Sequence, residues 1–377
     1  MTAATGSDPL ARLTALPGVP DAVTAARSSI DALLRHRVMR RGSAKVTAEV
    51  SLRAARASAA LEGYDVGLET LRAHLGRDLS MAAFSTGSPT GTGSPTDTDF
   101  PADAGSPADT GGAAMSGPTG EESAGNAAYT SVTLDTSVTL GAVRLYAELG
   151  TLRGAWERAP RQALARMHVL AAHGLVADTD LGRPRMSDRF ASPSAAIVPA
   201  GQPASVSAGQ TASGGAHAPV IVAGSADPTD PLGLGPAPSP TETAARLSGL
   251  TELLLARTSA PAIVVAAIVE GELLTIRPFG TFDGIIARAA GRLVLISRGL
   301  DPKAVTATEV GHIESGRIAT GETATGDTTT SVYAGAARAY AAAGAEGVSQ
   351  WIIYYARALE LGARESLAIC EAVARAN

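Results

Sequence analysis

Residues 261–300 read PAIVVAAIVEGELLTIRPFGTFDGIIARAAGRLVLISRGL, and no other stretch of the chain constrains its architecture as strongly. The only charged residues between Ala262 and Ile276 are Glu270 and Glu272, which predicts a helix buried on all sides. The residues RPFG at 277–280 predict a tight turn, and a second apolar helix follows from about Asp283. The segment therefore predicts a buried helical hairpin.

The turn of this hairpin is a candidate anion site. Backbone N–H groups at a helix N-terminus attract negative charge, and Arg277 and Arg288 could add positive charge there. The alternative is a proline turn of purely structural character, with both arginines facing solvent. The spacing of the residues does not distinguish the two.

Helical patterns also dominate the rest of the ordered sequence, which predicts an all-α protein. No run of six residues alternates polar and apolar positions, and the best strand candidates are Ile197–Val198 and Val220–Val222. The Thr-rich stretch Ile318–Ser331 is expected to be a loop. The further helices are expected at 21–39, 44–61, 66–75, 140–152, 161–175, 242–257, 303–314 and 347–376.

Two windows of low complexity, Phe84–Ala127 and Phe190–Thr241, contain no Lys or Arg. They have too little apolar sequence to offset the entropy lost on ordering, so we expect long disordered insertions there. The alternative is a docking segment for a basic partner, or a phosphorylation target. The expected organisation is helices at 1–83, a linker at 84–127, core at 128–189, an insertion at 190–241 and core again at 242–377.

Composition excludes several classes of function. The net charge of −5 and the pI of about 5.7 argue against nucleic-acid binding. A single cysteine, Cys370, and six histidines without ligand spacing make a metal site unexpected. Neither a phosphate-binding GxxxxGK[ST] loop nor a GxGxxG unit is present. No secretory signal or membrane-spanning run is visible, so we expect a cytoplasmic protein without membrane contact.

The turn and the second helix resemble the signature of the Fic (Fido) family, H-P-F-x-[DE]-G-N-G-R-x-x-R. Pro278, Phe279, Gly284 and Arg288 match the signature. The departures fall on its chemical positions: the histidine, the acidic residue, the first glycine, the asparagine and the first arginine are here Arg277, Thr281, Phe282, Asp283 and Ile285.

A second element carries the same resemblance. Some Fic proteins have an inhibitory helix with the pattern [ST]-x-x-x-E-[GN], and Ser58, Glu62 and Gly63 fit it, N-terminal to the hairpin. In those proteins the glutamate pairs with the second motif arginine, which implies a contact between Glu62 and Arg288. The stretch 161–185 is similar to the family's core helix and the Gly–Arg element that follows it. The resemblance thus implies a Fic-like helical bundle with an inhibitory-type helix.

Fic enzymes transfer AMP or a related group to a target hydroxyl, with the motif histidine as general base. Arg277 cannot accept a proton, because a guanidinium stays protonated in proteins. Thr281 is a much poorer Mg²⁺ ligand than a carboxylate, and Ile285 removes a phosphate-binding cation. The resemblance therefore implies a pseudoenzyme that has lost AMP transfer.

What replaces the lost activity stays open at this point. The chain could bind ATP or another nucleotide without turnover, or act as a protein-interaction module, as a monomer or a homo-oligomer. A rival is an active enzyme with repurposed chemistry: a nucleotidyl- or phosphotransferase, or an oxidoreductase for which no cofactor motif is visible. A transcription regulator is disfavoured by the net acidity and the lack of a helix-turn-helix segment.

Overall fold

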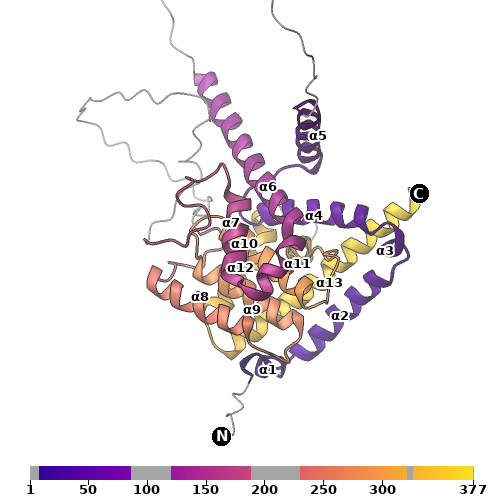
Figure 1. Cartoon of the computed structure of the whole chain (residues 1–377), viewed down its shortest axis with the longest axis vertical. Coiled ribbons are helices and arrows are strands. Elements are labelled where there is room, and N and C mark those ends of the chain that lie inside the picture. The colour runs from indigo at the N-terminus through magenta and orange to yellow at the C-terminus, as the bar shows by residue number, and fades with distance from the viewer. Residues whose placement is uncertain (1–7, 86–119, 188–229, 321–325, 377) are drawn as a thin grey trace, which may run out of the picture. The chain divides into compact units, whose positions relative to one another are not determined.

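The computed structural model of the 377-residue chain describes residues 8–85, 120–187, 230–320 and 326–376 (Figure 1). All the regular elements in these residues are α-helices, as the sequence predicts. Their bounds are α1 Pro9–Thr14, α2 Val19–Arg35, α3 Val38–Arg41, α4 Ser43–Ala60, α5 Leu68–Ser85, α6 Gly120–Arg158, α7 Pro160–Ala172, α8 Pro240–Leu255, α9 Ala262–Ile276, α10 Asp283–Ser297, α11 Thr308–Thr320, α12 Gly326–Ala341 and α13 Ala345–Arg375. Both strand candidates lie outside the described residues.

The described helices fall into two compact units. One comprises the chain up to Val66 and from Leu134 onward, and the other comprises Gly67–Thr133, which holds α5 and the first part of α6. The first unit contains the motif turn and every contact discussed below. None of the described helices is both long and apolar enough to cross a membrane.

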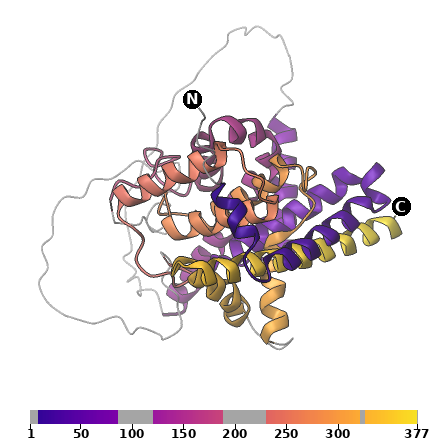
Figure 2. The same ribbon diagram turned by 90° about the horizontal axis from the view of Figure 1, so that it is seen from below.

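Helices α9 and α10 form the centre of the first unit, in agreement with the predicted hairpin. All residues of α10 from Asp283 to Ile296 are buried, as are twelve of the fifteen residues of α9. The long helix α13 packs along α2 and α11, and its run beside α2 is visible in Figures 1 and 2. The hairpin is thus enclosed by helices that come from both ends of the chain.

Close packing of α11 on α13 depends on glycine. A Cβ atom built on Gly311 would lie 1.9 Å from the carbonyl oxygen of Ala358, and one on Gly362 would lie 2.3 Å from that of Ala307. Two helix backbones can approach this closely only where the side chain is absent. These two glycines therefore allow α13 to pack directly on α11 and on the residue before it.

The prediction of a loop at Ile318–Ser331 is wrong for the residues of this stretch that the structure describes. Helix α11 continues to Thr320, and α12 starts at Gly326. Threonine has a modest helix propensity, but α12 buries Tyr333 and Ala337 against the core, and this packing outweighs the propensity.

Both low-complexity windows are also shorter than expected at their edges. Gly120–Ala127 belongs to α6, and residues 230–241 lie against the core, with Leu232 buried. The carboxylate of Asp230 accepts hydrogen bonds from the N–H groups of Leu234 and Gly235, both at 2.8 Å, which holds this segment in a turn. Residues 86–119 and 188–229 lie outside the described part of the chain.

Candidate functional site

The motif turn is built from backbone conformations that side chains rarely adopt. Helix α9 ends at Ile276, and Arg277 follows it with φ of 43°. Gly280 has φ of 74°, and Phe282, directly before α10, has φ of 56°. Left-handed conformations of this kind cost free energy in residues other than glycine, so the surroundings must hold them. At Phe282 the packing of the buried ring helps to hold the left-handed backbone conformation.

Asp283 occupies the candidate anion site at this turn. Its Oδ1 accepts the N–H of Phe279 at 2.9 Å, and its Oδ2 accepts the N–H of Gly280 at 2.7 Å. Burial raises the pKa of Asp283 to about 7; the two hydrogen bonds and the nearby Arg277 lower it, while Glu62 raises it further. We call the two N–H groups of Phe279 and Gly280 the turn cradle, and in this structure the protein's own carboxylate occupies it.

The pair implied by the inhibitory-type motif is present. Arg288 Nη2 lies 2.9 Å from Glu62 Oε1, and the side chains are 0% and 10% exposed. Arg288 also donates to the hydroxyl of Ser58 at 2.9 Å and to its carbonyl oxygen at 2.7 Å. Helix α4 ends at Ala60, and Gly63 adopts a left-handed φ of 92°. Arg288 thereby ties the end of α4 to α10.

The carboxylate of Glu62 lies against the start of α10. A Cβ atom built on Gly284 would be only 1.9 Å from Glu62 Oε1. A carboxylate is stabilised near a helix N-terminus by the helix dipole. Two carboxylates of the protein, those of Asp283 and Glu62, therefore crowd the end of α10 where a phosphate would be expected to bind.

The side chain of Arg277 contacts the segment that precedes α8. Its Nη1 lies 3.5 Å from Asp230 Oδ1, and its Nη2 donates to the carbonyl oxygen of Gly235. Arg185 joins the same segment to the turn. Its backbone N–H donates to Pro278 O at 2.8 Å, and its side chain donates to Arg277 O at 3.0 Å and to the carbonyl oxygen of Pro238. We call the contacts of Arg185 and Arg277 with residues 230–238 the clamp. Two arginines thus hold residues 230–238 over the motif turn.

Thr281 has a buried partner that no sequence pattern indicated, His168 on α7. The Nε2 atom of His168 lies 3.0 Å from Thr281 Oγ1, and its ring stacks on Phe279 with centroids 4.5 Å apart. Its Nδ1 accepts the N–H of Gly182 at 2.9 Å, so in the neutral ring the proton is on Nε2 and is donated to Thr281. Burial lowers the pKa of His168 to about 4, although Asp180 opposes this, so the ring is neutral at pH 7.

The remaining motif positions are structural. Ile285 is fully buried in the core. The side chain of Arg288 also contacts the core. Its Nη1 lies 3.2 Å from the hydroxyl of Tyr333, and this hydroxyl donates to Glu270 Oε1 at 3.1 Å. Within the ranges that the structure describes, no group of three or more His, Cys, Asp or Glu side chains gathers as a metal site would require.

These features define the class: an all-α protein with a helical hairpin whose turn is closed by its own carboxylates and arginines. No protein-family model matches the chain, and no curated protein matches it. Among solved structures it is similar to a Fic family protein from Desulfovibrio desulfuricans G20. The two share 15% identity, the match covers 92% of this chain and 74% of that one, and the TM-score is 0.49.

Proposed function

We propose that this chain is a Fic-like pseudoenzyme that transfers no AMP and acts as a protein-interaction module. The observation that carries the proposal is the occupation of the turn cradle by Asp283. A phosphate group would have to displace a carboxylate that already satisfies both N–H groups. It would also have to approach Glu62, which lies at the same helix end.

The residues at three positions of the Fic signature cannot perform the chemical roles of those positions. Arg277 has no lone pair to accept a proton, and it is engaged by Asp230 and Gly235. Thr281 is neutral and bonded to His168, and the buried Ile285 cannot contact phosphate. The base, the metal ligand and one phosphate-binding cation are missing together, which argues for loss of the reaction rather than a variant of it.

His168 is a candidate for a replacement base at the turn, and its contacts argue against that role. Both ring nitrogens are engaged, one by Gly182 and the other by Thr281. The side chain is 1% exposed, and its lowered pKa makes it a weak base. This disfavours an active enzyme with repurposed chemistry at the motif turn.

Closure of the turn favours protein interaction over nucleotide binding. Arg277, Phe279, Thr281 and Asp283 are all buried, and residues 230–238 are clamped over them by Arg185 and Arg277. A nucleotide could enter only after this clamp opened. The Lys- and Arg-free windows, in contrast, have a composition suited to docking on a basic protein.

We expect no transfer of labelled AMP from ATP above background, either to the chain itself or to added protein. Arg277→His is expected to stay at background too, because Thr281 and Ile285 still lack the metal and phosphate contacts and Asp283 still fills the turn cradle. The measurement is autoradiography after incubation with α-labelled ATP, with and without Mg²⁺. Mg²⁺-dependent labelling of the wild-type chain would refute the proposal.

A further inference from the structure

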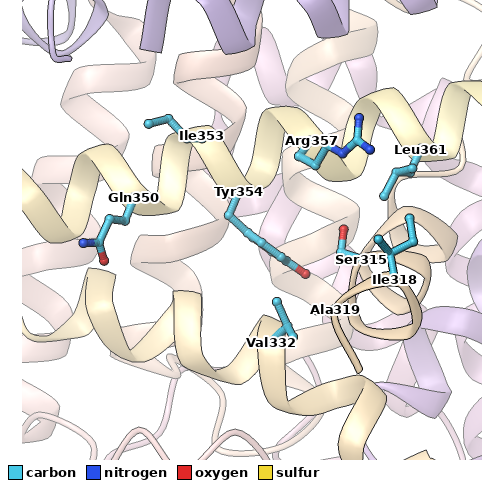
Figure 3. A pocket seen from close by; sticks show the side chains of 9 residues that line it. All are labelled: Ser315, Ile318, Ala319, Val332, Gln350, Ile353, Tyr354, Arg357 and Leu361. Carbon is cyan, nitrogen blue, oxygen red and sulfur yellow. The ribbon is translucent and has the colours of Figure 1, made fainter. Parts of the chain in front are cut away.

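A pocket separate from the motif turn opens between α11, α12 and α13 and has a volume of about 430 Å³. This lies within the range of about 300–1,000 Å³ that is usual for small-molecule sites. Figure 3 shows the ring of Tyr354 extending from α13 towards Val332 on α12 and Ile318 on α11. The walls therefore come from three helices that the core already holds in place.

The interior of the pocket is apolar. Ile318, Ala319, Val332 and Ile353 contribute hydrocarbon surface, and Ile318 is 57% exposed. The hydroxyl of Tyr354 lies 3.2 Å from His312 Nδ1, so the polar group of this ring already has a partner. An occupant would thus bury apolar surface without leaving the Tyr354 hydroxyl unsatisfied.

The rim of the pocket carries a positive charge. Arg357 uses its Nη1 to bind Glu360, and Arg364 binds the same carboxylate. Two guanidinium groups share one carboxylate, so this trio has a net charge of +1. A guanidinium has five N–H donors, which leaves Arg357 able to bind a second carboxylate.

We propose that this pocket binds a small amphipathic carboxylic acid, with its hydrocarbon part against Tyr354 and Ile318 and its carboxylate on Arg357. A protein interface commonly needs about 20–30 residues on each side, far more than this concave pocket presents, so a small molecule is the better fit. The inference does not depend on the loss of AMP transfer, since none of these residues belongs to the motif turn.

Calorimetric titration of the full chain with sodium octanoate and, separately, with octanol tests the proposal. Wild type is expected to bind octanoate saturably at one site. Ala319→Trp fills the pocket from an exposed position and should weaken octanoate binding at least about tenfold. Ala48→Trp, a change at another exposed alanine, on α4, should leave octanoate binding unchanged.

Arg357→Gln separates the two parts of the proposed ligand. It should weaken octanoate binding by about threefold to tenfold while leaving octanol binding unchanged. Far-ultraviolet circular dichroism confirms that each variant is folded. Absence of saturable octanoate binding, or equal affinity in Ala319→Trp, would overturn the site. Equal loss of both ligands in Arg357→Gln would overturn the assignment of the carboxylate to that arginine.

Discussion

Arg288→Met is expected to lower the free energy of unfolding by about 3–5 kcal/mol, the cost of removing one partner from a buried ion pair. Methionine fills much of the same volume but donates no hydrogen bond. It would leave the carboxylate of Glu62 without its cation and the carbonyl oxygen of Ser58 without a donor. Urea denaturation of the full chain, followed by circular dichroism, measures the change.

The exposed pair Arg153–Glu157 on α6 is the matched control, since its side chains are 52% and 45% exposed. Glu157→Gln should cost about 0–1 kcal/mol. The double variant Glu62→Gln/Arg288→Met should recover part of the loss, because no unpaired charge remains. If Arg288→Met costs no more than the control, the pair is not the buried link between α4 and α10 described above.

Gly284→Ala is expected to destabilise the protein by about 1–3 kcal/mol, the usual cost of forcing extra volume into a packed site. The new methyl group would meet Glu62 Oε1 at 1.9 Å, so the carboxylate must leave the end of α10 and give up its contact with Arg288. In a Glu62→Ala background this obstacle is gone. The same change should then cost much less, and the difference between the two costs is the coupling energy.

Gly150→Ala on α6 controls for the general effect of alanine in a helix. A Cβ atom there meets nothing within 4 Å, so this variant should gain up to about 1 kcal/mol from helix propensity. A cost for Gly284→Ala that is the same with and without Glu62 would contradict the close approach of Glu62 to α10.

The sequence was sufficient to predict the parts of the fold that depend on local pattern. The run of apolar residues after Pro261 predicted the buried helix α9, and RPFG predicted the turn after it. The contact between Glu62 and Arg288 followed from a family resemblance and is present in the structure. Local rules failed at the Thr-rich start of α12, where burial of Tyr333 on the same helix outweighs propensity.

The closure of the candidate site could not be predicted in the same way. The sequence shows an aspartate at position 283, but its acceptance of both turn N–H groups depends on left-handed conformations at Arg277 and Phe282. His168 meets Thr281 across 113 positions of sequence, and Arg277 meets Gly235 across 42. Contacts of this kind are set by how the helices pack, and a single sequence carries no periodic signal for them.

Closure of the turn by Asp283 is tested most directly by following the backbone amide resonances of Phe279 and Gly280 while the full chain is titrated with Mg²⁺ and ATP. These two N–H groups are the donors that Asp283 occupies. We expect no saturable shift of either resonance up to millimolar nucleotide, with shifts no larger than those of an exposed amide. A saturable, Mg²⁺-dependent shift of both resonances would show that phosphate displaces Asp283, and would contradict the claim that the protein's own carboxylate closes this site.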